Sequence, residues 1–270
     1  MNTKRRTWVL SWTCLSIGLL FAVSVAENKN DRFEALFRGE LKMIDLTYPL
    51  NRANPYWPGP AYFPFKLQKI ASIDTHLAYS NTYCTPEHLG THLDAPNHFV
   101  KGQISVDQIP LAQLFGPAVV VDVTKKVSVS SDYQLSVADL RVWEKVNGPI
   151  PQGAIILAYT GWGKRWNDYT RYKNADERGN LHFPGYAFEA AEFLIRERKI
   201  RGLGIDTLSV DHGPSEDFKV HVISHGAGKY HLENVANLDK LPPKGAYLIV
   251  APIKIEGGSG GQARIFAMIP

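Results

Sequence analysis

The segment from residue 88 to residue 98 constrains the fold of this chain more than any other. It reads His-Leu-Gly-Thr-His-Leu-Asp-Ala-Pro-Asn-His and holds three of the nine histidines of the 270-residue chain. Gly90 and Pro96 oppose a helix, so we expect an extended segment. Side chains of an extended chain alternate with a period of two. The even numbering therefore predicts that four side chains converge on one side: His88, His92, Asp94 and His98.

The side chains of this segment are of the kind that bind transition-metal ions. Imidazole and carboxylate groups together are typical ligands of Zn²⁺ and Mn²⁺. Three protein ligands with one open position are typical of a catalytic metal, and a carboxylate can also bridge two ions. We therefore expect a catalytic metal site here. The alternative is that these groups are core or surface polar residues that form hydrogen bonds with the backbone.

Short apolar runs separated by Pro and Gly make up most of the rest of the chain. Six of them are strand candidates: 43–48, 118–123, 154–159, 202–206, 246–251 and 264–269. We expect one helix capped by Ser136 and ended by Gly148, and a second that follows Pro184 and Gly185. Because helices and strands alternate only in part, the sequence favours a mixed α/β fold with a β-sheet core and flanking helices. We expect residues 27–270 to form a single domain.

The first 26 residues have the pattern of a secretion signal. Three basic residues at positions 4–6 precede an uncharged run from residue 7 to residue 25. We expect cleavage after Ala26 and a secreted or periplasmic chain that is not attached to a membrane; the alternative is an uncleaved anchor. Without the three basic residues the net charge falls from +4 to +1. We therefore expect no nucleic-acid partner, since binding nucleic acid requires a basic surface.

Residues 88–98 match every fixed position of the motif H-x-G-T-H-x-D-x-P-x-H. On this motif the chain resembles the metal-dependent cyclase family, which includes bacterial kynurenine formamidases and isatin hydrolases. The resemblance extends from about Ile44 to the C-terminus. Residues 55–59 are similar to the family's Trp-Pro-Gly segment, and His221 and Glu233 have the family's spacing of twelve. The resemblance implies a fold of the swivelling β/β/α type and an assembly of several identical copies.

The resemblance also implies roles for particular residues. His88, His92 and Asp94 would hold a first metal ion, and Asp94 would share a second ion with His221 and Glu233. Some relatives bind one ion only, so we expect one or two ions of Zn²⁺ or Mn²⁺ per chain. The implied role of His98 is proton transfer, with metal ligation as the alternative. Trp57 would line the substrate pocket, and further aromatic candidates are Tyr56, Phe63 and Phe65.

The remaining histidines and the cysteine receive no role from the sequence. His76 and His182 have no partner pattern, and three others flank the second group of ligands without matching the motif: His212, His225 and His231. Ser209 and Asp211-His212 contain the residue types of a catalytic triad, but no G-x-S-x-G segment accompanies them. Residues 257–261 are expected to form a loop near the pocket. Cys84 is the one cysteine after the signal, and we expect a half-buried apolar side chain.

The expected chemistry follows from the site. A metal ion lowers the pKa of bound water to about 7, which makes hydroxide available to attack an amide carbonyl. The resemblance implies an arylformamidase-like hydrolase that cleaves N-formylkynurenine, a small aromatic amide, to kynurenine and formate. Export puts this substrate in doubt, because the kynurenine pathway operates mostly inside cells. The alternatives are isatin-like lactam hydrolysis and an exported, non-catalytic protein that binds metal or a ligand.

Overall fold

The computed structural model describes residues 34–35 and 38–269, so the expected signal segment lies outside the described residues. Eight strands form one sheet, in the order β1 (Lys42–Asp45), β12 (Gly260–Ile269), β11 (Tyr247–Pro252), β5 (Phe115–Asp122), β7 (Ile155–Tyr159), β9 (Gly202–Ile205), β10 (Tyr230–Glu233) and β4 (His92–Asp94). All six predicted strands are among them. β4 also pairs with the start of β12, which closes the sheet into a barrel beside which β1 extends.

Strands β7 and β9 are buried on both faces, which explains their nearly continuous apolar sequences. Strands β5, β7, β9 and β10 are parallel neighbours, and the other pairs in the barrel are antiparallel. Alternate residues of β5 point to opposite sides: Val120 joins the apolar cluster inside the barrel, whereas Val119 and Val121 join a second cluster beneath helices. The mixed α/β fold with a sheet core is therefore confirmed.

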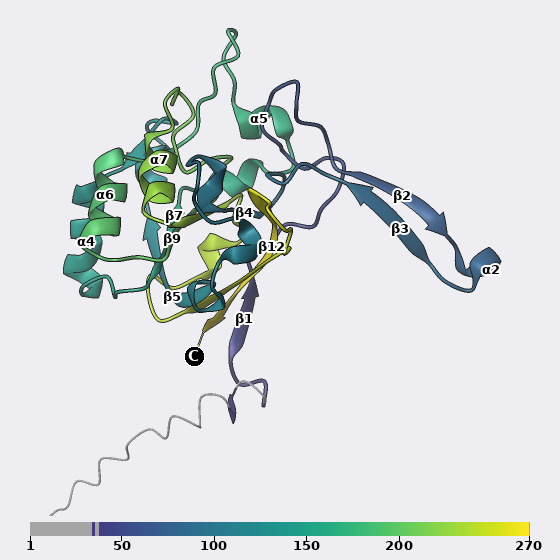
Figure 1. The fold of residues 1–270 in the computed structure, drawn as a ribbon. Coiled ribbons are helices and arrows are strands. Elements are labelled where there is room, and N and C mark those ends of the chain that lie inside the picture. The colour runs from purple at the N-terminus through teal and green to yellow at the C-terminus, as the bar shows by residue number, and fades with distance from the viewer. Residues whose placement is uncertain (1–33, 36–37, 270) are drawn as a thin grey trace, which may run out of the picture.

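Helices α4 (Val137–Asn147), α6 (Phe188–Arg196) and α7 (Lys219–Gly226) stand together on one flank of the barrel (Figure 1). The first two are the helices predicted from the sequence. Ser136 caps α4 and forms a capping box with Asp139, and the helix ends at Gly148, whose φ of 85° suits glycine. Helix α7 was missed, because its sequence carries Val, Ile and two His, and the left-handed residue Phe218 precedes it.

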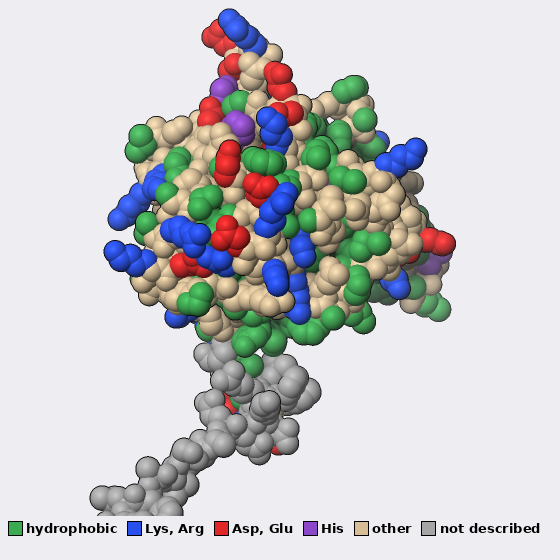
Figure 2. Space-filling model, turned by 60° about the vertical axis from the view of Figure 1, so that its left-hand side comes forward, with side chains coloured by type: hydrophobic (Ala, Val, Ile, Leu, Met, Phe, Trp, Pro, Cys, Tyr) green, Lys and Arg blue, Asp and Glu red, His purple; other side chains and the backbone are tan. Residues whose placement is uncertain are grey.

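The remaining elements are short. They are α2 (Ile73–His76), α3 (Thr124–Val127), α5 (Tyr169–Lys173), a two-residue pair β6 (Gln134–Leu135) with β8 (Gly185–Tyr186), and five 3₁₀ turns of which η1 (Pro96–His98) matters below. On the flank that carries α4 and α6, Lys and Arg side chains lie among Asp and Glu rather than in a continuous track (Figure 2). Within residues 34–35 and 38–269, no helix is both long and apolar enough to cross a bilayer.

A hairpin of β2 (Lys66–Ala71) and β3 (Ser80–Cys84) extends away from the barrel, with α2 at its tip (Figure 1). Its large apolar side chains are mostly in solvent; those more than half exposed are Leu67, Ile70, Ile73, Leu77, Tyr79 and Tyr83. Cys84 is exposed too, so the expectation of a half-buried side chain is wrong. The reason is that a two-stranded hairpin without a covering layer buries neither face.

Candidate metal centre

Two buried strands, β4 and β10, carry four of the ionisable side chains at the centre. Their antiparallel register sets His92 opposite Glu233 and Asp94 opposite His231. Between these residues Leu93 pairs with Leu232, and both belong to the apolar cluster inside the barrel. Because side chains alternate along a strand, the leucines point into the barrel and the polar residues point out toward α7. Each ligand is thus placed by an apolar neighbour.

The motif begins with a turn at residues 88–91 rather than a strand, and this turn brings His88 to the centre. Gly90 has a φ of 71°, and a side chain there would also clash with Leu50. The Gly90 carbonyl accepts hydrogen bonds from His92 Nδ1 at 2.9 Å and Asn234 Nδ2 at 2.9 Å. The expectation of an extended chain from residue 88 to residue 98 is therefore correct only for residues 92–94.

His98 reaches the centre from a 3₁₀ turn that begins at Pro96. Its ring stacks on the ring of His88, with 3.8 Å between centroids. Proline suits the first position of such a turn because its φ is already close to the helical value. The predicted convergence of the four side chains therefore occurs, but a turn and a 3₁₀ helix produce it instead of strand alternation.

Asp94 divides its two carboxylate oxygens between two groups of histidines. Oδ1 lies 2.6 Å from His88 Nδ1 and 3.1 Å from His92 Nε2. Oδ2 lies 3.4 Å from His221 Nε2, on helix α7. This is the arrangement that a carboxylate shared between two ions requires.

Glu233 completes the cluster from the end of β10. Its Oε2 lies 3.5 Å from His92 Nε2, and its Oε1 lies 3.4 Å from His221 Nε2. Ligand atoms about 2.1 Å from a tetrahedral ion are about 3.4 Å apart, so these spacings suit a metal site. The structure brings together all six residues that the sequence singled out for metal binding and proton transfer: His88, His92, Asp94, His98, His221 and Glu233.

The electrostatics of the cluster favour a bound cation. Asp94 and Glu233 are buried side by side, and the ion pairs that they form among the described residues are all with histidine. Burial and the charge of Asp94 raise the pKa of Glu233. Burial opposes the charged form of His92, yet Asp94 and Glu233 raise its pKa to about 9. Two buried carboxylates thus require positive charge, which a divalent ion would supply.

Three buried polar atoms of the cluster have no hydrogen-bond partner among the described residues: His92 Nε2, Asp94 Oδ2 and His231 Nδ1. Such atoms are costly in a protein interior unless something binds them. Nitrogen and carboxylate oxygen are the donor types that Zn²⁺ and Mn²⁺ accept. The residues present therefore fit a metal ion.

His98 differs electrostatically from the ligand histidines. Burial, together with the charges of His88 and His221, lowers its pKa to about 3 although Asp94 acts in the opposite direction. The ring is therefore neutral at physiological pH, and a neutral imidazole has one nitrogen free to accept a proton. A pKa so far below neutral makes a weak base, so the expectation of proton transfer rests on the position of His98 in the lining of the cavity described below.

Asp211 holds His221 in place, and the sequence did not predict this contact. His221 Nδ1 donates to Asp211 Oδ2 at 2.6 Å, and the backbone N–H groups of Val220 and His221 donate to the same carboxylate. Asp211 therefore orients His221 and does not pair with His212, so the apparent Ser/His/Asp set does not exist. No spacing rule of the sequence indicates this contact, because Asp211 precedes a loop and His221 lies on the next helix.

Asn234 fixes the end of β10 beside the cluster. It has a φ of 54°, a left-handed conformation that asparagine tolerates. Its side chain donates to the Gly90 carbonyl and accepts from Tyr172, and its own carbonyl accepts from Thr91. These bonds join the turn after His88 to the strand that carries Glu233. Ser259, in the glycine-rich segment 257–261, also contacts the centre. Its Oγ lies 2.9 Å from His88 Nε2.

A cavity of about 120 Å³ opens onto the cluster, with His88, His98, His221 and Glu233 in its lining. Its other side is aromatic, formed by Trp57, Tyr62, Phe99 and Phe218. Trp57 is therefore in the lining of a cavity beside the cluster, and its contact with a substrate stays a prediction. Tyr56, Phe63 and Phe65 do not line the cavity; Phe65, for example, packs against Tyr83 of the hairpin.

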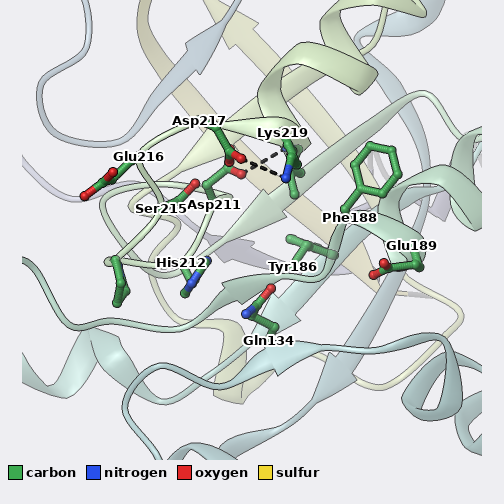
Figure 3. Close-up of a pocket in the computed structure, with 12 residues that line it drawn as sticks. Gln134, Tyr186, Phe188, Glu189, Asp211, His212, Ser215, Glu216, Asp217 and Lys219 are labelled. Carbon is green, nitrogen blue, oxygen red and sulfur yellow. Dashed lines mark hydrogen bonds and ion pairs between the residues drawn. The ribbon is translucent and has the colours of Figure 1, made fainter.

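A larger outer hollow, of about 680 Å³, lies where α6 and α7 begin (Figure 3). Polar side chains such as His212, Glu216 and Lys219 surround it, and the metal-binding candidates do not line it. Asp211 borders this hollow while it holds His221. Asp211 is therefore a lining residue of this hollow that also contacts a residue of the cluster.

Comparisons with known proteins agree with this geometry. A family model described as Cyclase matches residues 44–212. The chain is 34% identical over 250 residues to an isatin hydrolase of Roseibium aggregatum, covering 87% of this chain and 94% of the relative. A kynurenine formamidase of Sphingopyxis alaskensis is 26% identical over 223 residues, which is 83% of this chain and 96% of the relative.

Among solved structures, isatin hydrolase A from Ralstonia solanacearum superimposes with a TM-score of 0.83 at 37% identity. The match covers 92% of this chain and 100% of the other. The strand order, the histidine cluster and the matched residues therefore point to one conclusion. This chain belongs to the cyclase family.

Proposed function

We propose that this chain is a metal-dependent hydrolase that opens a neutral cyclic aryl amide of the isatin type. The isatin hydrolases named above support this proposal, since they share 34% and 37% of their residues with this chain. The kynurenine formamidase shares 26%. The buried cluster of imidazole and carboxylate groups supports the metal dependence.

The lining of the cavity carries the choice of substrate. None of the described residues that line it is Lys or Arg. N-formylkynurenine carries an α-carboxylate and an α-ammonium group, and burying a carboxylate without a cationic partner is costly. Isatin is flat, bicyclic and uncharged, so it suits a cavity with aromatic lining residues such as Trp57 and Phe218. The cavity therefore favours the lactam.

The chemistry divides between the ions and the chain. When bound, a divalent ion held by the cluster would polarise a substrate carbonyl and acidify water. The oxygen of water adds to the amide carbon, the C–N bond breaks, and a proton must travel from water to the departing nitrogen. His98, neutral and beside the cavity, takes that proton and returns it to the nitrogen. Trp57 and Phe218 hold the aryl ring, and the walls limit the access of bulk water.

The proposal is tested by hydrolysis of isatin and of N-formylkynurenine by the chain starting at Glu27. Activity is measured after chelation and after Zn²⁺ or Mn²⁺ is restored. We expect opening of isatin that chelation abolishes and metal restores. His98→Ala should lower the rate about 10²- to 10⁴-fold with the metal content unchanged, and His182→Ala, on the surface, should change neither.

Each other outcome identifies a different function. Faster release of kynurenine from N-formylkynurenine would favour the arylformamidase, the second candidate, which the formamidase relative supports. Silence on both substrates with bound metal would favour a binding protein. A His98→Ala variant with the full rate would remove His98 from the mechanism.

We also propose that the chain acts outside the cytoplasm as an assembly of identical copies. The signal-like pattern of residues 1–26 supports export, and the exposed apolar side chains of the β2–β3 hairpin support an assembly, since large exposed apolar patches mark contact surfaces. N-terminal sequencing of the exported protein tests cleavage after Ala26. Light scattering tests assembly, and a monomer at all concentrations would contradict it.

A further inference from the structure

His231 lies within the cluster, although the family motif gives it no role. It stands two residues before Glu233 on β10, so both side chains point to the same side of the strand. The His231 side chain is fully buried, and its Nδ1 lies 3.8 Å from Asp94 Oδ2. Its ring is 4.6 Å from that of His221, centroid to centroid. His231 is therefore beside the half of the cluster that contains His221 and Glu233.

The neighbours of His231 determine which ring nitrogen carries the proton. Ser224 Oγ donates its own proton to the Val220 carbonyl, so it accepts from His231 Nε2. With the proton on Nε2, Nδ1 presents a lone pair. This nitrogen has no hydrogen-bond partner among the described residues, and it faces Asp94. A buried lone pair beside a carboxylate is unfavourable unless a cation lies between them.

The same arrangement occurs at two of the predicted ligands. His92 donates from Nδ1 to the Gly90 carbonyl and presents Nε2 to Asp94 and Glu233. His221 donates from Nδ1 to Asp211 and presents Nε2 to the same two carboxylates. Metal-binding histidines typically donate their other N–H to an oxygen in this way, which fixes the ring and its tautomer. His231 satisfies the same rule with a hydroxyl.

We infer that His231 Nδ1 is a ligand of the metal ion that Asp94, His221 and Glu233 hold. The inference rests on the proposed metal dependence and assigns different roles to the two halves of the cluster. Four protein ligands close a tetrahedral site, which is typical of a structural ion. His88, His92 and Asp94 are three ligands, so the position that substrate needs stays open in their half.

His225 provides the control, because it is as buried as His231 and lies beside it but has a different hydrogen-bond environment. It is fully buried and its ring stacks on His231, with 4.2 Å between centroids. Neither of its nitrogens has a hydrogen-bond partner among the described residues, so nothing orients a lone pair toward the carboxylates. His225→Phe preserves the stacked ring and removes both nitrogens.

The test measures metal binding by the chain starting at Glu27, without substrate. Wild type, His231→Gln, His231→Asn and His225→Phe are dialysed against buffered Zn²⁺, and ions per chain are counted by mass spectrometry. Titration with Co²⁺, followed by visible absorption, reports the ligand field of each ion. We expect two ions in the wild type and in His225→Phe. His231→Gln, which retains an amide for Ser224 and lacks Nδ1, should bind the second ion at least about tenfold more weakly.

His231→Asn places an oxygen near the position of Nδ1 and should recover part of the lost affinity. Far-ultraviolet circular dichroism shows that each variant is folded. The inference is overturned if His231→Gln binds both ions as tightly as the wild type, if His225→Phe loses the second ion equally, or if the wild type binds only one. A chain that binds two ions but opens no amide would contradict the proposed function alone.

Discussion

Two of the antiparallel strand pairs, β4–β10 and β2–β3, have opposite surroundings. The residues of β4 and β10 are buried throughout, and their side chains pack on the barrel interior on one side and on the metal-binding cluster on the other. The hairpin of β2 and β3 pairs over more residues, yet nearly all its side chains are exposed. Both pairs are antiparallel, with one register shift between Lys69 and Ala71 in the hairpin, and the main difference between them is the packing of their side chains.

The comparison shows what holds a candidate ligand in position. In β4, Leu93 lies between two ligands and is locked in the apolar cluster of the barrel, so His92 and Asp94 have little freedom. In β2, the side chain of Leu67 is 55% exposed and nothing restrains it. A chemical site therefore requires the first kind of strand pair, whereas the second kind suits a contact surface.

The largest expected effect comes from removing a carboxylate of the buried pair. Asp94→Ala takes away the oxygens that face both groups of histidines, so it should abolish metal binding and lower kcat/KM for isatin at least about 10³-fold. Asp74→Ala, at the exposed tip of the hairpin, should change neither quantity. Metal counting and steady-state kinetics measure both. An Asp94→Ala chain that retains its ions would contradict the view that the buried strand pair β4–β10 supplies the metal ligands.

The next effect concerns stability rather than chemistry. Leu93→Ala leaves a cavity inside the barrel and should lower the free energy of unfolding by about 2–5 kcal/mol. Leu67→Ala removes an exposed side chain from the hairpin and should lower it by less than about 0.5 kcal/mol. Urea unfolding followed by tryptophan fluorescence measures both values. Equal losses would show that the hairpin is covered in solution.

A smaller effect is expected from Asp211, which orients His221 by a hydrogen bond without facing the two buried carboxylates. Asp211→Asn retains an acceptor for His221 but removes the charge, and should weaken metal binding or activity about 10- to 100-fold. Asp217→Asn is the matched control, because Asp217 borders the same outer hollow and pairs with Lys219 at 2.8 Å (Figure 3). If both variants behave alike, Asp211 does not position His221.

The smallest effect is expected at an exposed ion pair. The hydrogen bond from His182 to Asp132, 2.8 Å long, raises the pKa of His182 above its ordinary value of 6.5. Its contribution to stability is therefore complete below about pH 6.5 and disappears as the pH rises through the raised pKa. Because both side chains are about one third exposed, we expect at most about 0.5 kcal/mol. His182→Ala should remove this pH dependence of the unfolding free energy.

The sequence predicted those elements whose signal is local. The strands of the barrel and helices α4 and α6 carry apolar runs and caps, and the motif names its own polar residues. Asp211 and His231 were missed because their roles depend on pairings between distant segments. For His231 a signal existed: a histidine two residues before Glu233 in an apolar run predicts a shared strand face. The hairpin was missed because exposed strands lack the apolar alternation that marks buried ones.

The exposed position of Cys84 has a practical consequence for studying the centre. It is the one cysteine of the chain after residue 26, and it ends β3 four residues before His88. On the chain starting at Glu27, a maleimide fluorophore or nitroxide would therefore attach at a single place without any engineered mutation. Its signal would report the binding of paramagnetic Mn²⁺ at the cluster. It would also report contacts between the β2–β3 hairpin and another molecule.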